Sequence, residues 1–324
     1  MLVRLFRTNQ PGILVLLLAL VPLLFWKHLG STPPPASIAM PLATLLNTLF
    51  VAAPWSYGVL VLAVIALLAV QLAVLMNEGE LVDRRTHLVA LLFPVILAAL
   101  APAGSLGAPL FGMPFLVWAM RRAWSVTSGG PALSPLFDAG FLVGVAAQFY
   151  MPFAFMGVVI WAGISVIRPF LWRDYLMPVL GLLLTFYLAW AAMHLSGMTP
   201  WRPLRTITTT TGVSTVPSSA HRAVLWTGLL GVLVVAMYHF AGHYRRGVVR
   251  EQNLRTAFLA FALCLGLVVF LVYLLNGEVP MVLISVPLSM LCVFAFLGER
   301  RAWLSETVLF ALLFMALYMQ VGAA

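Results

Sequence analysis

Charged residues are scarce in this sequence. Asp, Glu, Lys and Arg make up 8% of its 324 residues, while 63% are hydrophobic. A soluble globular domain carries about a quarter charged residues, so a chain with so few cannot cover a water-facing surface. Apolar runs of about 20 residues, the length that crosses a bilayer, recur along the whole chain. The composition excludes a soluble protein and predicts one integral membrane domain over 1–324.

Residues that bind metals are also few. Cys264 and Cys292 fall inside apolar runs, where a thiol behaves as a small hydrophobe, so no disulfide or cysteine-rich metal site is expected. Of the six histidines, His239 and His243 stand four residues apart, on one face of a helix. Zinc and iron sites need at least a third ligand, and none is close in sequence. We therefore expect no bound metal and no cofactor.

Basic residues outnumber acidic ones by 18 to 9. They stand in ones and twos between the apolar runs rather than in one stripe, which argues against a nucleic-acid partner. Lys and Arg are enriched in the cytoplasmic loops of membrane proteins. The basic residues are therefore expected to report the topology of the chain.

The hydrophobic pattern predicts an all-α polytopic transmembrane helical bundle with about eleven spans. We place them at 12–29, 55–76, 88–104, 107–120, 136–150, 152–167, 175–196, 223–242, 256–275, 280–297 and 303–321. The first is interpreted as an uncleaved span rather than a signal peptide, because Lys27, His28 and a run of prolines make a poor cleavage region.

Two segments do not fit the pattern of spans. Residues 41–53 are apolar but too short to cross, and they are expected to lie on the outer surface or to re-enter the membrane. A hairpin crossing together with 55–76 is the alternative. Residues 197–222 are rich in threonine and form the longest predicted outer loop.

The predicted spans place fourteen of the 18 basic residues on the cytoplasmic side. These are Arg4, Arg7, Arg84, Arg85, Arg121, Arg122, Arg168, Arg173, Arg245, Arg246, Arg250, Arg255, Arg300 and Arg301. The other four, Lys27, Arg202, Arg205 and Arg222, fall outside. This imbalance predicts a cytoplasmic N-terminus, an external C-terminus and a location in a bacterial inner membrane.

Small residues predict one close helix contact. Gly140 and Gly144 form a GxxxG arrangement, which lets another helix approach closely. Pro152 either starts the helix after it or kinks a continuous one. We interpret these three residues as packing devices.

The loop 77–87 is the densest polar cluster of the chain. It contains Glu78, Arg84 and Arg85 among three acids and two arginines in eight residues. Such a loop is either a solvated turn that pairs its own charges or a docking surface for a partner. It is the first candidate contact site.

The segment 168–174 is the second candidate contact site. Arg168, Trp172 and Arg173 fall at the predicted membrane interface, where tryptophan and basic residues anchor a span. The same side chains suit contact with the phosphate of an anionic lipid.

Few polar residues are expected inside the membrane. Asp138 and Glu306 are placed at helix starts, where a carboxylate interacts favourably with the positive end of the helix dipole. The uncharged Asn47, Gln71 and Gln148 suit hydrogen bonds between helices, worth about 0.6–2 kcal/mol each. We expect no charged side chain deep in the membrane, so nothing in the sequence points to ion or proton coupling.

Several runs of sequence carry a family resemblance. They are LFRTNQP (5–11), NEG (77–79), LFDAGFLVG (136–144), FYMP (149–152) and RPFLWRD (168–174). They resemble an uncharacterised family of polytopic inner-membrane proteins of Bacteroidota, whose members are often mislabelled as carotene monooxygenases. The resemblance implies a multi-span membrane fold and brings no catalytic residue with it.

A weaker likeness is to the membrane module of glycosyltransferases that use polyprenyl-phosphate-linked sugars. There too a first span leads to helices on the outer surface, and a later span is rich in glycine. Those enzymes need an acidic residue in the first outer loop, whereas residues 30–54 contain neither Asp nor Glu. The likeness therefore extends to the scaffold and leaves out the chemistry.

Three functions remain open at this point. The first is a non-catalytic membrane subunit or scaffold of a cell-envelope assembly, with membrane lipids and other membrane-protein subunits as partners. The second is a glycosyltransferase-like or flippase-like protein that acts on a lipid-linked substrate. The third is a transporter or channel for a small solute. The sequence shows no catalytic or coupling residues, which favours the first function, and it identifies neither a partner nor a substrate.

Overall fold

The structure is a computed structural model that describes residues 2–7, 11–30, 40–82, 85–101, 106–126, 130–168, 170–196, 219–276, 279–297 and 302–322. Within these ranges the chain is helical and has no strand, which confirms the predicted all-α class. Most of the predicted outer loop 197–222 lies outside the described residues. Arg84 lies outside them as well.

Helices occupy every range in which a span was predicted. In chain order they are α1 (Leu2–Phe6), η1 (Pro11–Leu16), α2 (Leu17–Leu24), η2 (Trp26–Gly30), α3 (Pro41–Ala52), α4 (Trp55–Glu78), α5 (Leu88–Leu100), α6 (Ala108–Trp124), α7 (Leu133–Ala147), η3 (Met151–Met156), α8 (Gly157–Ile167), α9 (Trp172–Leu195), α10 (Ser219–Arg246), α11 (Val249–Asn276), α12 (Met281–Phe296) and α13 (Ala302–Gly322). Pro152 lies in the first turn of η3, where a proline needs no backbone hydrogen bond, so it starts a helix rather than kinking one.

Four helices are long and apolar enough to cross a membrane by length and composition. Among the described residues they are Trp55–Glu78, Trp172–Leu195, Trp226–Arg246 and Val249–Leu275, which belong to α4, α9, α10 and α11. Shorter apolar helices occupy most of the other predicted spans. These helices fit a membrane protein, and the number of eleven crossings stays a prediction.

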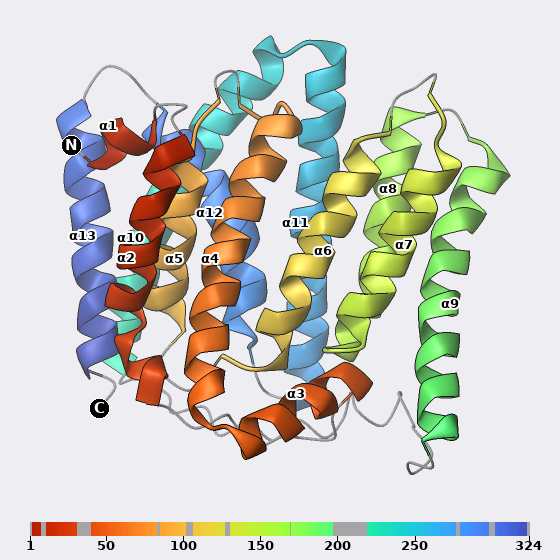
Figure 1. Ribbon diagram of the computed structural model, residues 1–324. Coiled ribbons are helices and arrows are strands. Elements are labelled where there is room, and N and C mark those ends of the chain that lie inside the picture. The colour runs from red at the N-terminus through yellow and green to blue at the C-terminus, as the bar shows by residue number, and fades with distance from the viewer. Residues whose placement is uncertain are drawn as a thin grey trace.

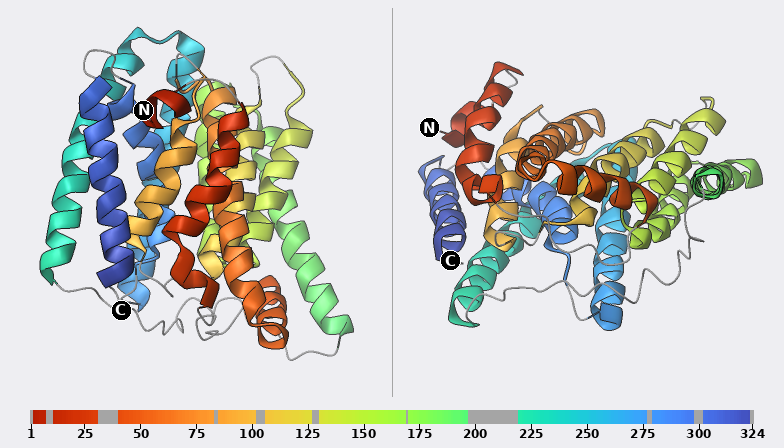
Figure 2. Two further views of the ribbon diagram at one scale, coloured as in Figure 1. Left: turned by 60° about the vertical axis from the view of Figure 1, so that its left-hand side comes forward. Right: turned by 60° about the horizontal axis from the view of Figure 1, so that its bottom comes forward.

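The helices run between two ends of a bundle, with the N-terminus at one end and the C-terminus at the other (Figure 1). α3 does not pass through the bundle but lies across the end that holds the C-terminus (Figures 1 and 2). Its Phe50 is buried, with its ring centroid 5.3 Å from that of Tyr57 and 5.8 Å from that of Phe111. Leu45 and Leu49 of the same helix are exposed. α3 therefore covers the bundle with one apolar side and leaves another uncovered.

The centre and the periphery of the bundle differ sharply in burial. Every residue of α5 is buried, and α5 packs against α12, whose residues are mostly buried too. α9 lies at the edge of the bundle (Figure 2). Its buried residues are Asp174, Pro178, Gly181 and Thr185, at spacings of four, three and four. This single stripe faces α7, and most of the remaining surface of α9 is exposed and apolar. Such a surface suits a helix that faces lipid.

Glycines let α7 and α9 pack closely. A Cβ added at Gly140 would overlap the backbone of α9, and one added at Gly181 would overlap the backbone of α7. At Gly144 an added Cβ would lie 2.6 Å from Thr185 Oγ1. That hydroxyl has one proton, and it lies 3.0 Å from the Gly181 carbonyl oxygen of its own helix and 3.2 Å from the Phe141 carbonyl oxygen of α7. The GxxxG arrangement thus lies at a helix contact of the kind that the sequence predicts.

The predicted capping roles of two acids are wrong. α7 begins at Leu133 and α13 at Ala302, so Asp138 and Glu306 lie beyond the first turn of their helices. The helix dipole is felt mainly within that first turn. Asp138 instead forms an ion pair with Arg122 of α6, with 2.9 Å between the charged atoms.

The interior amides also differ from prediction. Gln148 is buried, yet neither its Nε2 nor its Oε1 has a hydrogen-bond partner in the described part of the chain. Gln320 of α13, which the sequence reading missed, donates from Nε2 to the carbonyl oxygens of Ala98 and Ala101, at 3.0 Å each. These carbonyls lie at the C-terminal end of α5, where the helix leaves them without internal partners. Gln320 therefore caps the central helix.

Exposed tryptophans lie near both ends of the bundle. Trp172 starts α9, and Trp190 lies in its last two turns. Their spacing of 18 positions along the helix corresponds to about 27 Å. Trp226 lies near the start of α10. This start and the end of α9 are at the same end of the bundle (Figure 1). Tryptophan favours membrane–water interfaces, and the spacing on α9 is close to the hydrocarbon thickness of about 30 Å.

Candidate functional site

Most arginines lie at the end of the bundle that holds the N-terminus. α4, α6 and α10 end there, and α9 and α11 begin there (Figure 1). We call it the basic end; the arginines there whose side chains are described are Arg7, Arg85, Arg121, Arg122, Arg168, Arg173, Arg245, Arg246, Arg250 and Arg255. Lys27, in η2, lies at the opposite end. Both predicted contact sites are at the basic end.

The loop between α4 and α5 is fixed to the N-terminal segment. Asn77 Oδ1 accepts from the Thr86 backbone at 2.9 Å, and Asn77 Nδ2 donates to the Thr86 carbonyl oxygen at 3.2 Å. The carbonyl oxygen of Phe6 accepts from the His87 backbone at 2.9 Å and from Thr86 Oγ1 at 3.2 Å. Burial lowers the pKa of His87, so the imidazole adds no positive charge here near neutral pH.

Arg255 holds the same loop from the other side. Its side chain is fully buried, although it belongs to the second turn of α11. Nε donates to the Leu81 carbonyl oxygen at 3.2 Å, and a terminal nitrogen donates to the His243 carbonyl oxygen at 2.5 Å. Glu251, one turn earlier, lies 3.5 Å from the guanidinium. Arg255 therefore ties α10, α11 and the α4–α5 loop together.

The acids of this loop pair with other helices. Both Glu78 oxygens accept from Arg121 of α6, at 2.5 and 2.7 Å, and Glu80 lies 3.5 Å from Arg250 of α11. Both pairs are solvent-exposed, so each contributes little to stability by itself. The interpretation of a turn that pairs its own charges is therefore wrong for Glu78 and Glu80.

The second predicted site divides into a buried part and an exposed part. The side chains of Arg168 and Asp174 are 10% and 6% exposed and lie 3.2 Å apart. Arg168 also donates to the Gly130 carbonyl oxygen at 2.8 Å. Arg168 is thus engaged inside the protein, which leaves little of its side chain for the predicted contact with a lipid or partner, and that contact stays a prediction. Trp172 is exposed, and the Arg173 guanidinium lies 5.6 Å from its ring centroid, so these two remain at the surface.

Four exposed arginines at the basic end have no ion pair among the described residues. Arg85, Arg245 and Arg246 have no side-chain hydrogen bond or ion pair within the described residues, and Arg173 contacts the Trp172 ring. The other six each link separate segments, because Arg7 donates to the Leu297 carbonyl oxygen and the remaining five make the pairs given above. The exposed arginines carry the positive charge that is available for contact.

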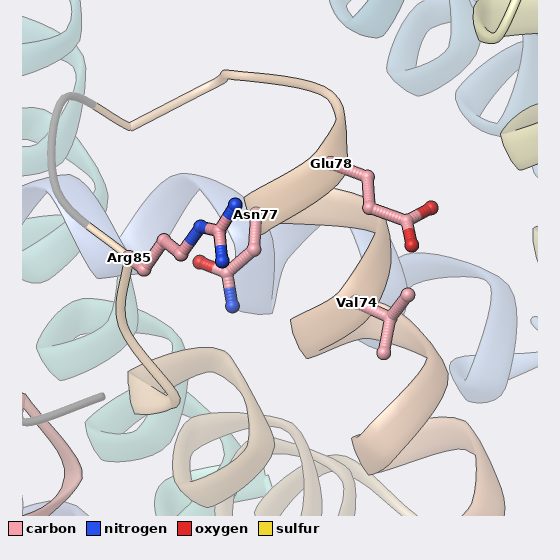
Figure 3. A pocket seen from close by; sticks show the side chains of 4 residues that line it. All are labelled: Val74, Asn77, Glu78 and Arg85. Carbon is pink, nitrogen blue, oxygen red and sulfur yellow. The ribbon is translucent and has the colours of Figure 1, made fainter. Parts of the chain in front are cut away.

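An open cleft of about 230 Å³ lies beside Arg85. Its lining consists of Val74, Asn77, Glu78 and Arg85. Figure 3 shows the side chains of Arg85 and Asn77, which both line the cleft, and the Glu78 carboxylate directed away from them. The cleft thus combines an unpaired guanidinium, an amide and an apolar wall.

His239 and His243 are linked through their own helix. His243 Nδ1 lies 2.9 Å from the His239 carbonyl oxygen, and the His243 ring packs against Phe294 of α12. Among the described residues no group of three or more His, Cys, Asp and Glu side chains is placed to hold a metal ion. The contacts of His243 are those of a packed residue.

The sequence reading missed Arg255 as well as Gln320. The one local signal for the burial of Arg255 is its position. It lies after the polar start of α11, and apolar residues fill the following turns. A charge at the edge of an apolar run is more often an interfacial anchor, so the signal alone does not predict burial.

These features describe an all-α protein with long apolar helices and a cross-linked basic end. A family model described as "Family of unknown function (DUF6427)" matches residues 37–323, which is most of the chain. The chain belongs to this family, and the resemblance to an uncharacterised family is confirmed at that level. No curated protein and no solved structure matches the sequence.

Proposed function

We propose that the protein is a non-catalytic membrane subunit or scaffold of a bacterial cell-envelope assembly, and that it meets its partners at the basic end. The observation that carries this proposal is the set of six arginines that link separate segments there. Cross-links between helices hold an end of a bundle in one shape, which a docking surface requires. The arginines outside this set are exposed at the same end.

The proposed placement is an inner membrane with the basic end in the cytoplasm. Exposed apolar helices and tryptophans near both ends support the membrane, and the concentration of arginine at one end supports the orientation. A reporter fused after Ala324 tests the topology, because eleven crossings put this residue outside. A cytoplasmic reporter signal would contradict the proposed number of crossings.

The contact proposal is tested by exchanging exposed charges. In the variant Arg173→Gln, Arg245→Gln and Arg246→Gln, three exposed guanidinium groups are lost, while every described cross-link remains. We expect weaker retention of co-purifying membrane proteins after gentle-detergent extraction, as measured by quantitative mass spectrometry. Lys27→Gln at the opposite end is the control. Retention at the level of the unchanged protein, with topology intact, would refute the proposed surface.

A protein that acts on a lipid-linked substrate is the second candidate. The cleft beside Arg85 favours it, because a guanidinium next to an amide suits a phosphate group. Turnover or translocation of a polyprenyl-phosphate sugar by the purified protein in vesicles would favour this candidate over the scaffold. Binding without turnover would favour the scaffold.

A further inference from the structure

We propose that the cleft lined by Val74, Asn77, Glu78 and Arg85 binds the phosphate of an anionic phospholipid, with one acyl chain along α4. The proposal deepens the proposed function, because it names one ligand of the basic end and rests on the membrane placement given above. It concerns a single cleft with defined walls and not the general attraction of a basic surface for lipid.

The charges around the cleft leave one positive charge unbalanced. The Glu78 carboxylate is neutralised by two hydrogen bonds from Arg121, at 2.5 and 2.7 Å. Glu80 lies 3.5 Å from Arg250, so it is paired elsewhere. Arg85 is exposed and has no ion pair in the described part of the chain. Among the described groups the unbalanced charge is therefore that of the Arg85 guanidinium, which matches the single negative charge of a phosphodiester.

The donors in the cleft suit phosphate oxygens. A guanidinium presents several N–H groups in a planar fork and can bind two oxygens of one phosphate. Asn77 Nδ2 uses one hydrogen for the Thr86 carbonyl oxygen, at 3.2 Å, and so retains a second donor. The bonds of Asn77 to Thr86 also hold the loop that carries Arg85, so the two donors lie on a fixed frame.

The surface of α4 continues from the cleft toward the other end of the bundle as an apolar stripe. Val59 and Leu67 are about half exposed, Ala63 between them is exposed, and Val74 follows at the cleft. Their spacings of four, four and seven place them on one side of a helix. From Val74 to Ala63 the stripe measures about 16 Å, which is about half of the hydrocarbon thickness and so suits one acyl chain.

The test measures lipid retention by the full chain. The protein is purified in a mild detergent, and its occupancy by added phosphatidylglycerol is measured by native mass spectrometry. Arg85→Gln is expected to weaken binding about tenfold, because it removes a charge-assisted contact. The matched control is Arg246→Gln, which removes an exposed arginine from the same end but not from the cleft, and it is expected to leave binding nearly unchanged.

A second variant separates the cleft from the charge. Val74→Phe narrows the cleft and keeps Arg85, so it is also expected to weaken binding of phosphatidylglycerol. Equal losses in Arg85→Gln and Arg246→Gln would show diffuse attraction and refute the site. Unchanged binding in both Arg85→Gln and Val74→Phe, with unchanged thermal unfolding, would refute it as well.

Two further arms identify the source of the phosphate. Inorganic phosphate at millimolar concentration is expected to compete poorly, because it does not contact the apolar stripe. Complete displacement of the lipid by it would overturn the lipid assignment. Phosphatidylethanolamine, which has no net charge, is expected to bind more weakly than phosphatidylglycerol, and equal binding would refute the charge argument. The reporter fusion after Ala324 tests membrane placement separately, so the two proposals can fail independently.

Discussion

The segments 77–87 and 168–174 each contain two arginines and lie at the basic end of the bundle, yet Arg85 and Arg168 behave in opposite ways. Arg168 is almost fully buried and paired with Asp174. Arg85 is exposed beside an open cleft and has no ion pair within the described residues. The difference comes from the acids: Asp174, in the first turn of α9, lies within reach of Arg168, whereas Glu78 and Glu80 pair with α6 and α11.

Buried and exposed arginines at the basic end serve different purposes, stability of the fold and contact with a ligand. A buried arginine that balances a buried carboxylate is needed for folding, and its removal leaves a charge without a partner. An exposed arginine without a partner is free to meet a ligand, and its removal costs the fold little. The same residue type at the same end of the protein therefore gives two different phenotypes.

The largest effect is expected from Arg168→Ala. The Asp174 carboxylate would remain buried without its counter-charge, which costs about 3–5 kcal/mol of unfolding free energy. A marked fall in the thermal unfolding midpoint in detergent would show it. Arg173→Ala, at the exposed neighbour, is the control and should change the midpoint little. The double variant Arg168→Ala with Asp174→Ala should recover part of the loss, and no recovery would mean that the pair is not the cause.

A slightly smaller effect is expected from Arg255→Met. It removes the two hydrogen bonds that the guanidinium donates to the carbonyl oxygens of Leu81 and His243, at a cost of about 2–4 kcal/mol. Among the described residues only the His243 oxygen keeps another donor, the Gly247 N–H. Hydrogen exchange of the amides in the α4–α5 loop should accelerate, because Arg255 holds that loop. Arg250→Met, which breaks an exposed pair with Glu80, is the control. Equal exchange in both variants would contradict the bracing role of Arg255.

Gly144→Leu should destabilise the contact that positions the segment 168–174. The added side chain would meet Thr185 of α9 where a Cβ alone lies 2.6 Å away, and overpacking of this kind costs about 1–3 kcal/mol. The yield of folded protein and its unfolding midpoint should both fall. Gly231→Leu in α10 is the matched control, because nothing lies within 4 Å of an added Cβ there. Similar losses in both variants would point to a general intolerance of leucine.

The smallest effect is expected from Glu78→Gln. Its pair with Arg121 is about half exposed on each side, so the coupling measured in a double-mutant cycle with Arg121→Gln should be about 0.2–1 kcal/mol. The coupling should decrease further in high salt. A coupling of several kcal/mol would show that this end of the bundle excludes water more than its exposure indicates.

Some features of the fold and the site follow from local sequence. Long apolar runs predict helices because a membrane requires every backbone hydrogen bond to be made inside the segment. Gly140 and Gly144 predict a close contact because they carry no side chain beyond the backbone. The start of a helix at Pro152 follows from its missing N–H group. Arg85 and Trp172 were identified as surface candidates for the same kind of reason, since their neighbours are polar or interfacial.

Other features depend on distant parts of the chain. Arg168 and Arg173 are only five residues apart in sequence. No local pattern shows that Arg168 is buried and Arg173 exposed. Asp138 was assigned to a helix start, but the helix begins five residues earlier and Arg122 of α6 is its partner. Gln320 finds its acceptors on α5, more than 200 residues away in sequence.

The sequence by itself determined the all-helical class, the approximate positions of the helices and the unequal distribution of arginine, because each depends on composition and on short-range periodicity. The tertiary structure alone decided which arginines are bound inside and which are exposed. An ion pair depends on the distance between two charged atoms, and that distance is set by how α4, α6, α7, α9 and α11 pack together at the basic end. Beside Arg85, the described acids Glu78 and Glu80 pair with arginines of other helices.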